Sequence, residues 1–302
     1  MKLSVVVPCY NEKASIKDFY EQLTKMLKKE KITYEIIFID DGSYDDTYLE
    51  IEEIITSDKN VRGIKFSRNF GKESAMLAGL EHATGEYVAI MDADLQHTPD
   101  MLVQMYKKLV DNTEYDVVCA YKANRRNEGS LKRTLTSIFY KVNNRISDVK
   151  LLPGASDFRV FTSSVKDAII SLPEKTRFLK GIFSWIGFNT IYVPYTPEKR
   201  LHGTSKWSII KLIKYSLGGI VSFSTKPIKF IFILGILVFM VGLINFLLMG
   251  NLANRTIILL ISIIMLSLGI MSLYISRIYS NILGRPNYII KKKSGFNNKT
   301  TK

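Results

Sequence analysis

The sequence predicts an α/β domain with a mostly parallel sheet, followed by two helices that form a membrane hairpin. Over residues 3–120, short apolar runs alternate with segments of helical periodicity, which is the βαβ pattern of a parallel sheet covered by helices. Near the C-terminus, two uncharged apolar segments of about the length that crosses a bilayer follow each other. The chain has 302 residues, enough for one substantial domain and a smaller part.

The expected elements alternate in order along the first part of the chain. Apolar runs bounded by turn-forming residues predict strands at residues 3–7, 35–39, 63–66, 87–91 and 117–120. Apolar residues at three- and four-residue intervals predict helices at residues 16–27, 47–55, 72–82 and 99–110. Thr98 and Pro99 add a start signal, because they suit the cap and first turn of the last helix.

Polar residues follow four of these strands at the point where each strand ends. They are residues 8–12, 40–43, 67–72 and 92–94. Each group could simply cap the next helix, but ligands of such sheets gather at the carboxyl ends of the strands, so together they predict one crevice. The sequence has no Gly-x-Gly-x-x-Gly and no Gly-x-x-x-x-Gly-Lys-Ser/Thr motif. We therefore expect phosphate to be held by a metal ion and basic side chains.

Two carboxylates, those of Asp92 and Asp94, stand one residue apart at the end of the fourth expected strand. In extended backbone, residues i and i+2 point to the same side, so the pair could face one ligand. Two like charges so close are unfavourable unless a cation or several donors neutralise them. Carboxylate oxygens suit Mg²⁺ or Mn²⁺, and Mg²⁺ commonly also takes substrate phosphates as ligands. A metal site is one interpretation of this pattern, and a solvated acidic turn is the other.

The net charge and the C-terminal segments indicate a membrane. A formal net charge of +14 suggests an anionic partner, either nucleic acid or a membrane surface. Residues 230–249 and 257–276 carry no charge, which favours a bilayer over nucleic acid and over buried core helices. Lys and Arg flank this pair, whereas the loop between its members carries only Arg255, so both termini are expected in the cytoplasm. The run at residues 3–7 is too short for a cleavable signal.

Three further segments and the two cysteines also allow structural predictions. Residues 124–146 are basic with an apolar stripe at helical spacing, and predict a helix that either enters a membrane interface or packs on its own domain. Residues 207–223 are expected to form an interfacial helix. The polar, basic tail after residue 290 is expected to be disordered. Cys9 and Cys119 lack metal-ligand spacing and are expected in the core.

Four motifs occur in a fixed order along the chain. They are Val5-Val6-Val7-Pro8-Cys9-Tyr10-Asn11-Glu12, Phe38-Ile39-Asp40-Asp41-Gly42-Ser43, Asp92-Ala93-Asp94-Leu95-Gln96 and Arg200-Leu201-His202-Gly203-Thr204-Ser205-Lys206-Trp207. Together they resemble the family-two inverting glycosyltransferases of GT-A fold. The closest resemblance is to the polyprenyl-phosphate glycosyltransferases, similar to bactoprenol glucosyltransferases and dolichol-phosphate mannose synthase. It covers nearly the whole chain, including the hairpin.

The resemblance implies roles for the donor-side residues. The nucleotide base and ribose would be held by Pro8, Tyr10, Glu12 and Asp41. A Mg²⁺ or Mn²⁺ ion on the donor diphosphate would be bound by Asp92 and Asp94. Asp94 would also be one of the catalytic residues. Ala93 and Gln96 would line the donor site.

The resemblance also implies roles on the acceptor side. Asp157 precedes an apolar run and matches the candidate catalytic base of the family. A phosphate acceptor has a second pKa of about 6 and therefore needs less help from a base than a sugar hydroxyl does. Asp157 could instead orient the acceptor, or it could cap a turn. Arg200 and Lys206 are expected to stabilise the leaving nucleotide, with contact to lipid headgroups as the alternative. Some members of the family have an Arg soon after the strand that ends here at Ala120. Whether Lys122 or Arg125 takes the place of that Arg in this chain stays open.

The prediction is therefore a metal-dependent inverting glycosyltransferase of the cell membrane. Its parts would be a cytosolic catalytic domain, an interfacial linker, two transmembrane helices and a basic cytoplasmic tail, at residues 1–205, 206–228, 229–277 and 278–302. It would transfer a sugar from a nucleotide diphosphate sugar, UDP-glucose or UDP-N-acetylglucosamine, to undecaprenyl (polyprenyl) phosphate.

Two alternative functions were weighed against this one. A processive polysaccharide synthase would carry a Gln-x-x-Arg-Trp motif and a larger membrane domain, and neither is present in the sequence. An inactive, membrane-anchored nucleotide-sugar sensor is disfavoured by the intact acidic pair and by Asp157. The sequence does not select the sugar, and nucleic acid is not an expected partner. Small residues would let the spans pack closely, namely Gly235, Gly242, Ser267 and Gly269. A homo-oligomer is implied by the resemblance alone.

Overall fold

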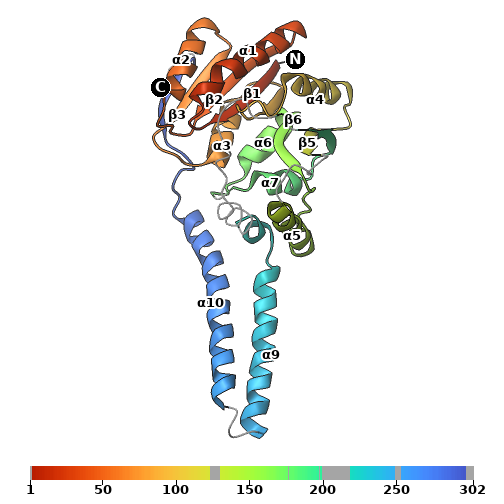
Figure 1. Ribbon diagram of the computed structural model, residues 1–302, viewed down its shortest axis with the longest axis vertical. Coiled ribbons are helices and arrows are strands. Elements are labelled where there is room, and N and C mark those ends of the chain that lie inside the picture. Colours follow the sequence, from red (N-terminus) through yellow and green to blue (C-terminus); the bar gives the residue numbers. More distant parts are fainter. Residues whose placement is uncertain are drawn as a thin grey trace.

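The computed structural model describes residues 2–122, 130–175, 177–196, 198, 218–248 and 253–296 (Figure 1). An eight-stranded sheet has the spatial order β7-β5-β6-β4-β1-β2-β3-β8. Its strands are β1 Lys2–Cys9, β2 Thr33–Asp40, β3 Val61–Phe66, β4 Tyr87–Ile90, β5 Val117–Lys122, β6 Ala155–Thr162, β7 Thr190–Tyr195 and β8 Ile290–Ser294. The helices with assigned bounds are α1 Lys13–Lys29, α2 Thr47–Ser57, α3 Lys72–His82, α4 Pro99–Asp111, α5 Ser130–Ile146, α6 Ser163–Ser171, α7 Leu179–Trp185, α9 Lys226–Leu248 and α10 Ala253–Ile282.

The sheet is mixed and mostly parallel. Strand β1 lies between β2 and β4 and is parallel to both, and β3 is parallel to β2. Strand β6 is antiparallel to β4 and β5, and β8 is antiparallel to β3. The predicted α/β domain is confirmed, and every strand and helix expected over residues 3–120 is present with bounds shifted by a few residues.

Helices cover both faces of the sheet, which explains why its central strands are continuous apolar runs. Val5 and Val7 of β1 belong to the core that includes residues of α1, α2 and α4, whereas Val6 belongs to the core on the other face, with residues of α3. All three valines are fully buried. Helix α3 lies so near β1 at Gly79 that an added Cβ would be 2.2 Å from Val6 Cγ1.

One carboxylate, that of Glu35, is buried near the amino end of β2. It accepts hydrogen bonds from Ser4 Oγ at 2.5 Å, Lys2 Nζ at 2.9 Å and Thr84 N at 2.7 Å, and Arg62 Nη1 lies 3.1 Å away. Burial alone would raise the pKa of Glu35, but these donors outweigh it and lower the pKa to about 2. The carboxylate therefore stabilises the fold in its charged form.

We expect Glu35 to make stability depend on pH in the acid range. Its folded pKa lies below the unfolded value of about 4.3, so its stabilisation is complete above the unfolded pKa and is lost as pH falls towards 2. A shift of this size is worth on the order of 3 kcal/mol. Glu35→Gln should lower the melting temperature at pH 7 and make its decline between pH 5 and pH 3 shallower, measured by scanning fluorimetry in detergent. The control is Glu53→Gln at an exposed position, and equal pH profiles for Glu35→Gln and wild type would contradict the expectation.

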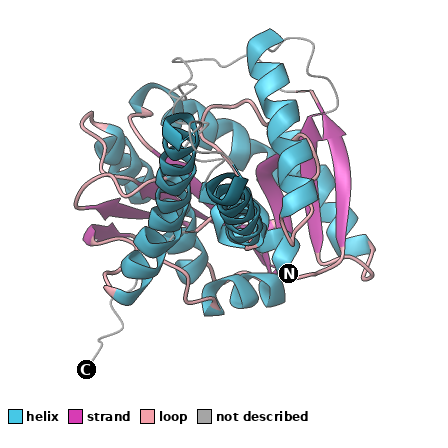
Figure 2. Ribbon diagram, turned by 90° about the horizontal axis from the view of Figure 1, so that it is seen from below, coloured by secondary structure: helices cyan, strands magenta, loops and turns pink. Residues whose placement is uncertain are grey.

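Helices α9 and α10 extend side by side from one end of the α/β domain (Figure 1 and Figure 2). Many of their large apolar side chains are exposed, such as Phe230, Phe232 and Leu268. Within the described residues, Ile263–Ile282 is the one segment that meets the length and composition of a membrane span, and none of it is buried inside the structure. The two predicted C-terminal apolar helices are thus confirmed as helices, and the crossing of a bilayer by both stays a prediction. Most of the expected interfacial helix at 207–223 lies outside the described residues.

After α10 the chain returns to the sheet. Strand β8 pairs with the edge strand β3, the ring of Tyr288 stacks on Phe66 at 4.8 Å, and Lys292 Nζ lies 2.6 Å from Glu52. The prediction of a disordered tail after residue 290 is wrong for this strand, because β3 offers unpaired backbone groups that the tail's composition does not reveal. The helix pair is therefore attached to the domain at both of its ends.

Candidate active site

The loops at the carboxyl ends of the strands contact one another in sequence. After β1, the Asn11 amide donates to Ser43 Oγ at 2.8 Å, which joins the first loop to the second. Asp41 joins the second loop to the third, where it accepts the Phe70 amide at 2.7 Å. Lys72 then joins the third loop to Asp92 in the fourth. The predicted convergence of these four polar groups is confirmed.

Asp41 fixes the loop that leads to α3. Besides the Phe70 amide, its carboxylate accepts the Gly71 amide at 2.9 Å, and burial raises the pKa of Asp41 to about 6 against these two donors. Gly42 has a φ of +68°, and an added Cβ would lie 2.3 Å from the carbonyl carbon of Arg68, so the two loops touch through backbone. Asp41 thus holds the segment that carries Lys72.

The acidic pair lies in a turn rather than in a strand. Strand β4 ends at Ile90, residues 93 and 94 form a turn, and Leu95 directly after them has a φ of +57°. Burial nevertheless alternates, so that Asp92, Asp94 and Gln96 are half-buried while the residues between them are buried. Asp94 Oδ1 accepts the Gln96 amide at 3.1 Å. The strand geometry was therefore wrong, and both carboxylates are partly exposed to solvent.

Lys72, at the first position of α3, bridges two carboxylates that are far apart in sequence. Its Nζ lies 2.7 Å from Asp92 Oδ1 and 3.1 Å from Asp157 Oδ2. Burial would lower the pKa of Lys72, but the two carboxylates outweigh it and raise the pKa above its ordinary value. In the sequence, Lys72 stands in the polar group after the third expected strand, and no role was predicted for it. Its position at a strand end was the available signal.

Asp157, in β6, has a second ammonium neighbour. Lys180 Nζ of α7 lies 3.8 Å from its Oδ1 and donates to the Ala155 carbonyl at 3.1 Å. Burial would raise the pKa of Asp157, but Lys180 and Lys72 hold it well below its usual range. The two ammonium groups therefore stabilise the charged form of the Asp157 carboxylate.

A buried histidine, His97, follows the acidic turn and contacts residues of β6 and β7. His97 Nε2 lies 3.1 Å from Tyr195 Oη and 3.2 Å from Ser156 Oγ, and its ring stacks on Phe158 at 4.6 Å. Burial lowers the pKa of His97 to about 4, so the ring is neutral at physiological pH. No role was predicted for His97 from the sequence, because its partners lie on β6 and β7.

The remaining residues predicted for the donor site differ in their contacts and in their burial. Pro8 is part of β1 beside Ile39, and the ring of Tyr10 packs edge-on against Tyr44 with centroids 6.5 Å apart. Glu12 stands at the N-cap position of α1 without a side-chain capping hydrogen bond, and its carboxylate accepts Ser15 Oγ at 3.0 Å. Ala93 is buried in the core, so only its backbone could face a donor.

The described part of the chain does not include the basic residues that we expect at the leaving group. Arg200 and Lys206, like Arg125, lie outside the described residues. Lys122 ends β5, and its amide donates to the Gly154 carbonyl at 3.0 Å.

The carboxylates of the acidic turn suit a hard divalent cation. In the described part of the chain, no cluster of three or more His, Cys, Asp or Glu residues could form a closed metal cage. Mg²⁺ commonly binds through one or two carboxylates together with substrate phosphates, and the oxygen donors of Asp92 and Asp94 fit that arrangement. The turn is therefore compatible with an ion that arrives with a phosphorylated ligand.

Fold and site together define an α/β protein whose charged groups gather where such proteins bind their ligands. The family model for "Glycosyl transferase family 2" matches residues 4–169, which is more than half of the chain. The chain belongs to glycosyltransferase family 2, as its motifs predicted.

Similar proteins extend over nearly the full length. The chain is 39% identical to the "Putative glycosyltransferase CsbB" of Bacillus subtilis, covering 96% of this chain and 91% of that protein. It is 38% identical to the "SfII prophage-derived bactoprenol glucosyl transferase" of Shigella flexneri, covering 97% and 98%. A glucosyl-3-phosphoglycerate synthase from Mycobacterium tuberculosis has a TM-score of 0.46 at 18% identity, covering 73% of this chain and 77% of that one.

Proposed function

We propose that this chain transfers a sugar from a nucleotide diphosphate sugar to undecaprenyl (polyprenyl) phosphate, with inversion, at the cytoplasmic face of a membrane. UDP-glucose is the first donor to test, because relatives called bactoprenol glucosyl transferases match along nearly their whole length. UDP-N-acetylglucosamine is the second. The observation that carries the proposal is the Lys72 bridge, since it joins Asp92, predicted for the donor, to Asp157, predicted for the acceptor.

On the donor side, Asp92 and Asp94 would hold Mg²⁺ or Mn²⁺, and this ion would neutralise the charge of the diphosphate and of the departing nucleotide. Tyr10 and Glu12 would contact the nucleoside from the end of β1. Asp41, whose carboxylate is bound to the loop before α3, would support the site by fixing Lys72.

On the acceptor side, the chemistry needs little proton transfer. The acceptor phosphate is largely an anion at neutral pH, and its oxygen forms the new bond to the anomeric carbon while the bond from that carbon to the diphosphate breaks on the opposite face. Lys72 and Lys180 would screen the repulsion between the two phosphorylated substrates, and Asp157 would keep both ammonium groups in place. Arg200 and Lys206 would stabilise the leaving nucleotide.

The test is an assay with the full-length protein in detergent. Radiolabelled UDP-glucose and UDP-N-acetylglucosamine are incubated separately with undecaprenyl phosphate, with and without EDTA, and the lipid is extracted. We expect a labelled, EDTA-sensitive lipid from one of the two donors. If no nucleotide sugar yields a labelled lipid, the proposed function is wrong.

A further inference from the structure

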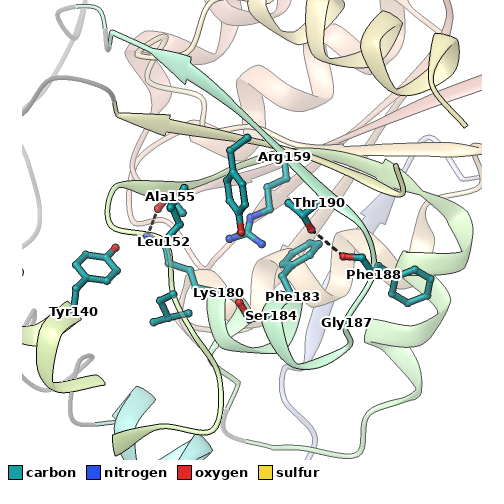
Figure 3. Close-up of a pocket in the computed structure, with 12 residues that line it drawn as sticks. Tyr140, Leu152, Ala155, Arg159, Lys180, Phe183, Ser184, Gly187, Phe188 and Thr190 are labelled. Carbon is teal, nitrogen blue, oxygen red and sulfur yellow. Dashed lines mark hydrogen bonds between the residues drawn. The ribbon is translucent and has the colours of Figure 1, made fainter. Parts of the chain in front are cut away.

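A cavity of about 270 Å³ lies next to Asp157, with walls from α5, β6, α7 and β7 (Figure 3). Lys180 belongs both to this cavity and to the surroundings of Asp157, so the cavity and the acidic site share a wall. Its volume is just below the range of about 300–1,000 Å³ typical of small-molecule sites. It therefore suits a head group and the first part of a chain rather than a large ligand.

The cavity contains a buried cation that makes no direct ion pair among the described residues, although the Asp157 carboxylate attracts it over a longer distance. The Arg159 side chain, only 5% exposed, lines it, and its Nε donates to the Ser156 carbonyl at 3.2 Å. Its guanidinium lies over the ring of Phe183 at 4.2 Å. Across the described residues, no carboxylate lies within salt-bridge distance of Arg159, although a buried charge is unfavourable unless it is paired. Lys180 lines the same cavity, which therefore presents two positive groups to a ligand (Figure 3).

The rest of the lining is largely apolar or aromatic. Tyr140, Leu152 and Phe188 contribute to it, and they come from α5 and from the loops next to β6 and β7. Positive groups combined with apolar walls suit a ligand that has an anionic head and a hydrocarbon chain. The lining also carries polar groups, and a small, fully hydrophilic anion would leave only its apolar side chains, such as Leu152 and Phe188, without a partner.

The cavity lies near the end of the domain from which the long helices extend. Helices α5 and α7 are between the sheet and α9 (Figure 1). The end of α5 is bound to the segment before α9, where Ser147 Oγ and the Asp148 amide donate to the Phe223 carbonyl at 3.1 and 2.9 Å. On α5 itself, Ile138 and Val142 are exposed apolar residues. A lipid that enters from a membrane around α9 and α10 would meet this end of the domain first.

We propose that the Arg159–Lys180 cavity binds the phosphate and first isoprene unit of an isoprenoid monophosphate. This inference rests on the proposed function, because it names where the acceptor of that reaction binds. It assigns the acceptor phosphate to Arg159 and Lys180, two residues to which the sequence motifs gave no role, and places it beside Asp157.

The test measures binding without turnover. Full-length protein in phosphatidylcholine nanodiscs is titrated with tritium-labelled farnesyl phosphate, and inorganic phosphate and phosphatidylglycerol are used as competitors. We expect Lys180→Met and Arg159→Met each to raise the Kd for farnesyl phosphate about 10-fold or more, the size of a lost hydrogen bond to a charged group. The matched control is Lys166→Met in α6, where Nζ donates to the Ala83 carbonyl at 3.2 Å and Kd should not change.

Each outcome decides the inference. A wild-type Kd in both cavity variants would overturn it. Equal competition by inorganic phosphate would overturn it too, because it indicates a plain oxyanion site. Equal competition by phosphatidylglycerol would do the same, because it indicates a bilayer-lipid site. If Arg159→Met lowers the melting temperature, the less buried Lys180 decides alone. Failure of sugar transfer with intact, cavity-dependent binding would refute the proposed function only, whereas transfer with an unchanged acceptor KM in Lys180→Met would refute this inference only.

Discussion

Asp92→Asn should abolish sugar transfer while the protein stays folded. Asparagine has the shape of aspartate but no charge, so the turn can keep its backbone while it loses its attraction for a divalent cation and for Lys72. Removal of one electrostatic partner at a reacting centre lowers kcat by about 100- to 1,000-fold, and the loss of a metal ligand should place this variant at or beyond the upper end. The measurement is initial rate of labelled lipid formation at saturating donor and acceptor.

Asp100→Asn is the matched control for this variant. Asp100 is an exposed carboxylate in the first turn of α4, eight positions further along the same segment. Its rate and its melting temperature should equal those of wild type. A rate for Asp92→Asn within a few-fold of wild type, in protein that melts normally, would remove Asp92 from the metal site.

Local sequence signals were sufficient for the elements that form the centre of the domain. Strands such as β1 and β2 are buried on both faces, so their apolar runs stand out without knowledge of their neighbours. Polar residues at strand ends likewise identified the acidic turn and Asp41, because the carboxyl ends of parallel strands meet at one edge.

The features that the sequence did not reveal depend on contacts between distant segments. The bridge from Lys72 to Asp157 spans 85 positions, and it forms because Asp41 fixes the loop before α3. Strand β8 pairs with β3 only because the chain returns from α10 to an open sheet edge. Arg159 follows Asp157 at the spacing that places two side chains on one face of a strand, but only α7 and β7 turn that face into a cavity.

Lys72→Met should lower kcat by about 100-fold and also reduce the Mg²⁺ concentration needed for half-maximal activity. The rate should fall because the Lys72 ammonium lies between Asp92 and Asp157, where two phosphorylated substrates would have to approach each other. The metal requirement should fall because that ammonium and a divalent cation neutralise the same Asp92 carboxylate, so its removal leaves the ion without a competitor. Steady-state rates at a series of Mg²⁺ concentrations measure both effects.

Lys65→Met distinguishes this role from a general loss of positive charge. Lys65 lies in β3, its Nζ is 3.7 Å from Asp40, and its side chain is 26% exposed against 30% for Lys72. The control should keep its kcat and its Mg²⁺ requirement, because Asp40 is not part of the bridge. A fall in both the rate and the Mg²⁺ requirement is specific to a cation that competes with metal and also assists the reaction. Unchanged values for both in Lys72→Met would show that the bridge has no part in catalysis, and a rate loss with a higher Mg²⁺ requirement would show that Lys72 only keeps Asp92 in place.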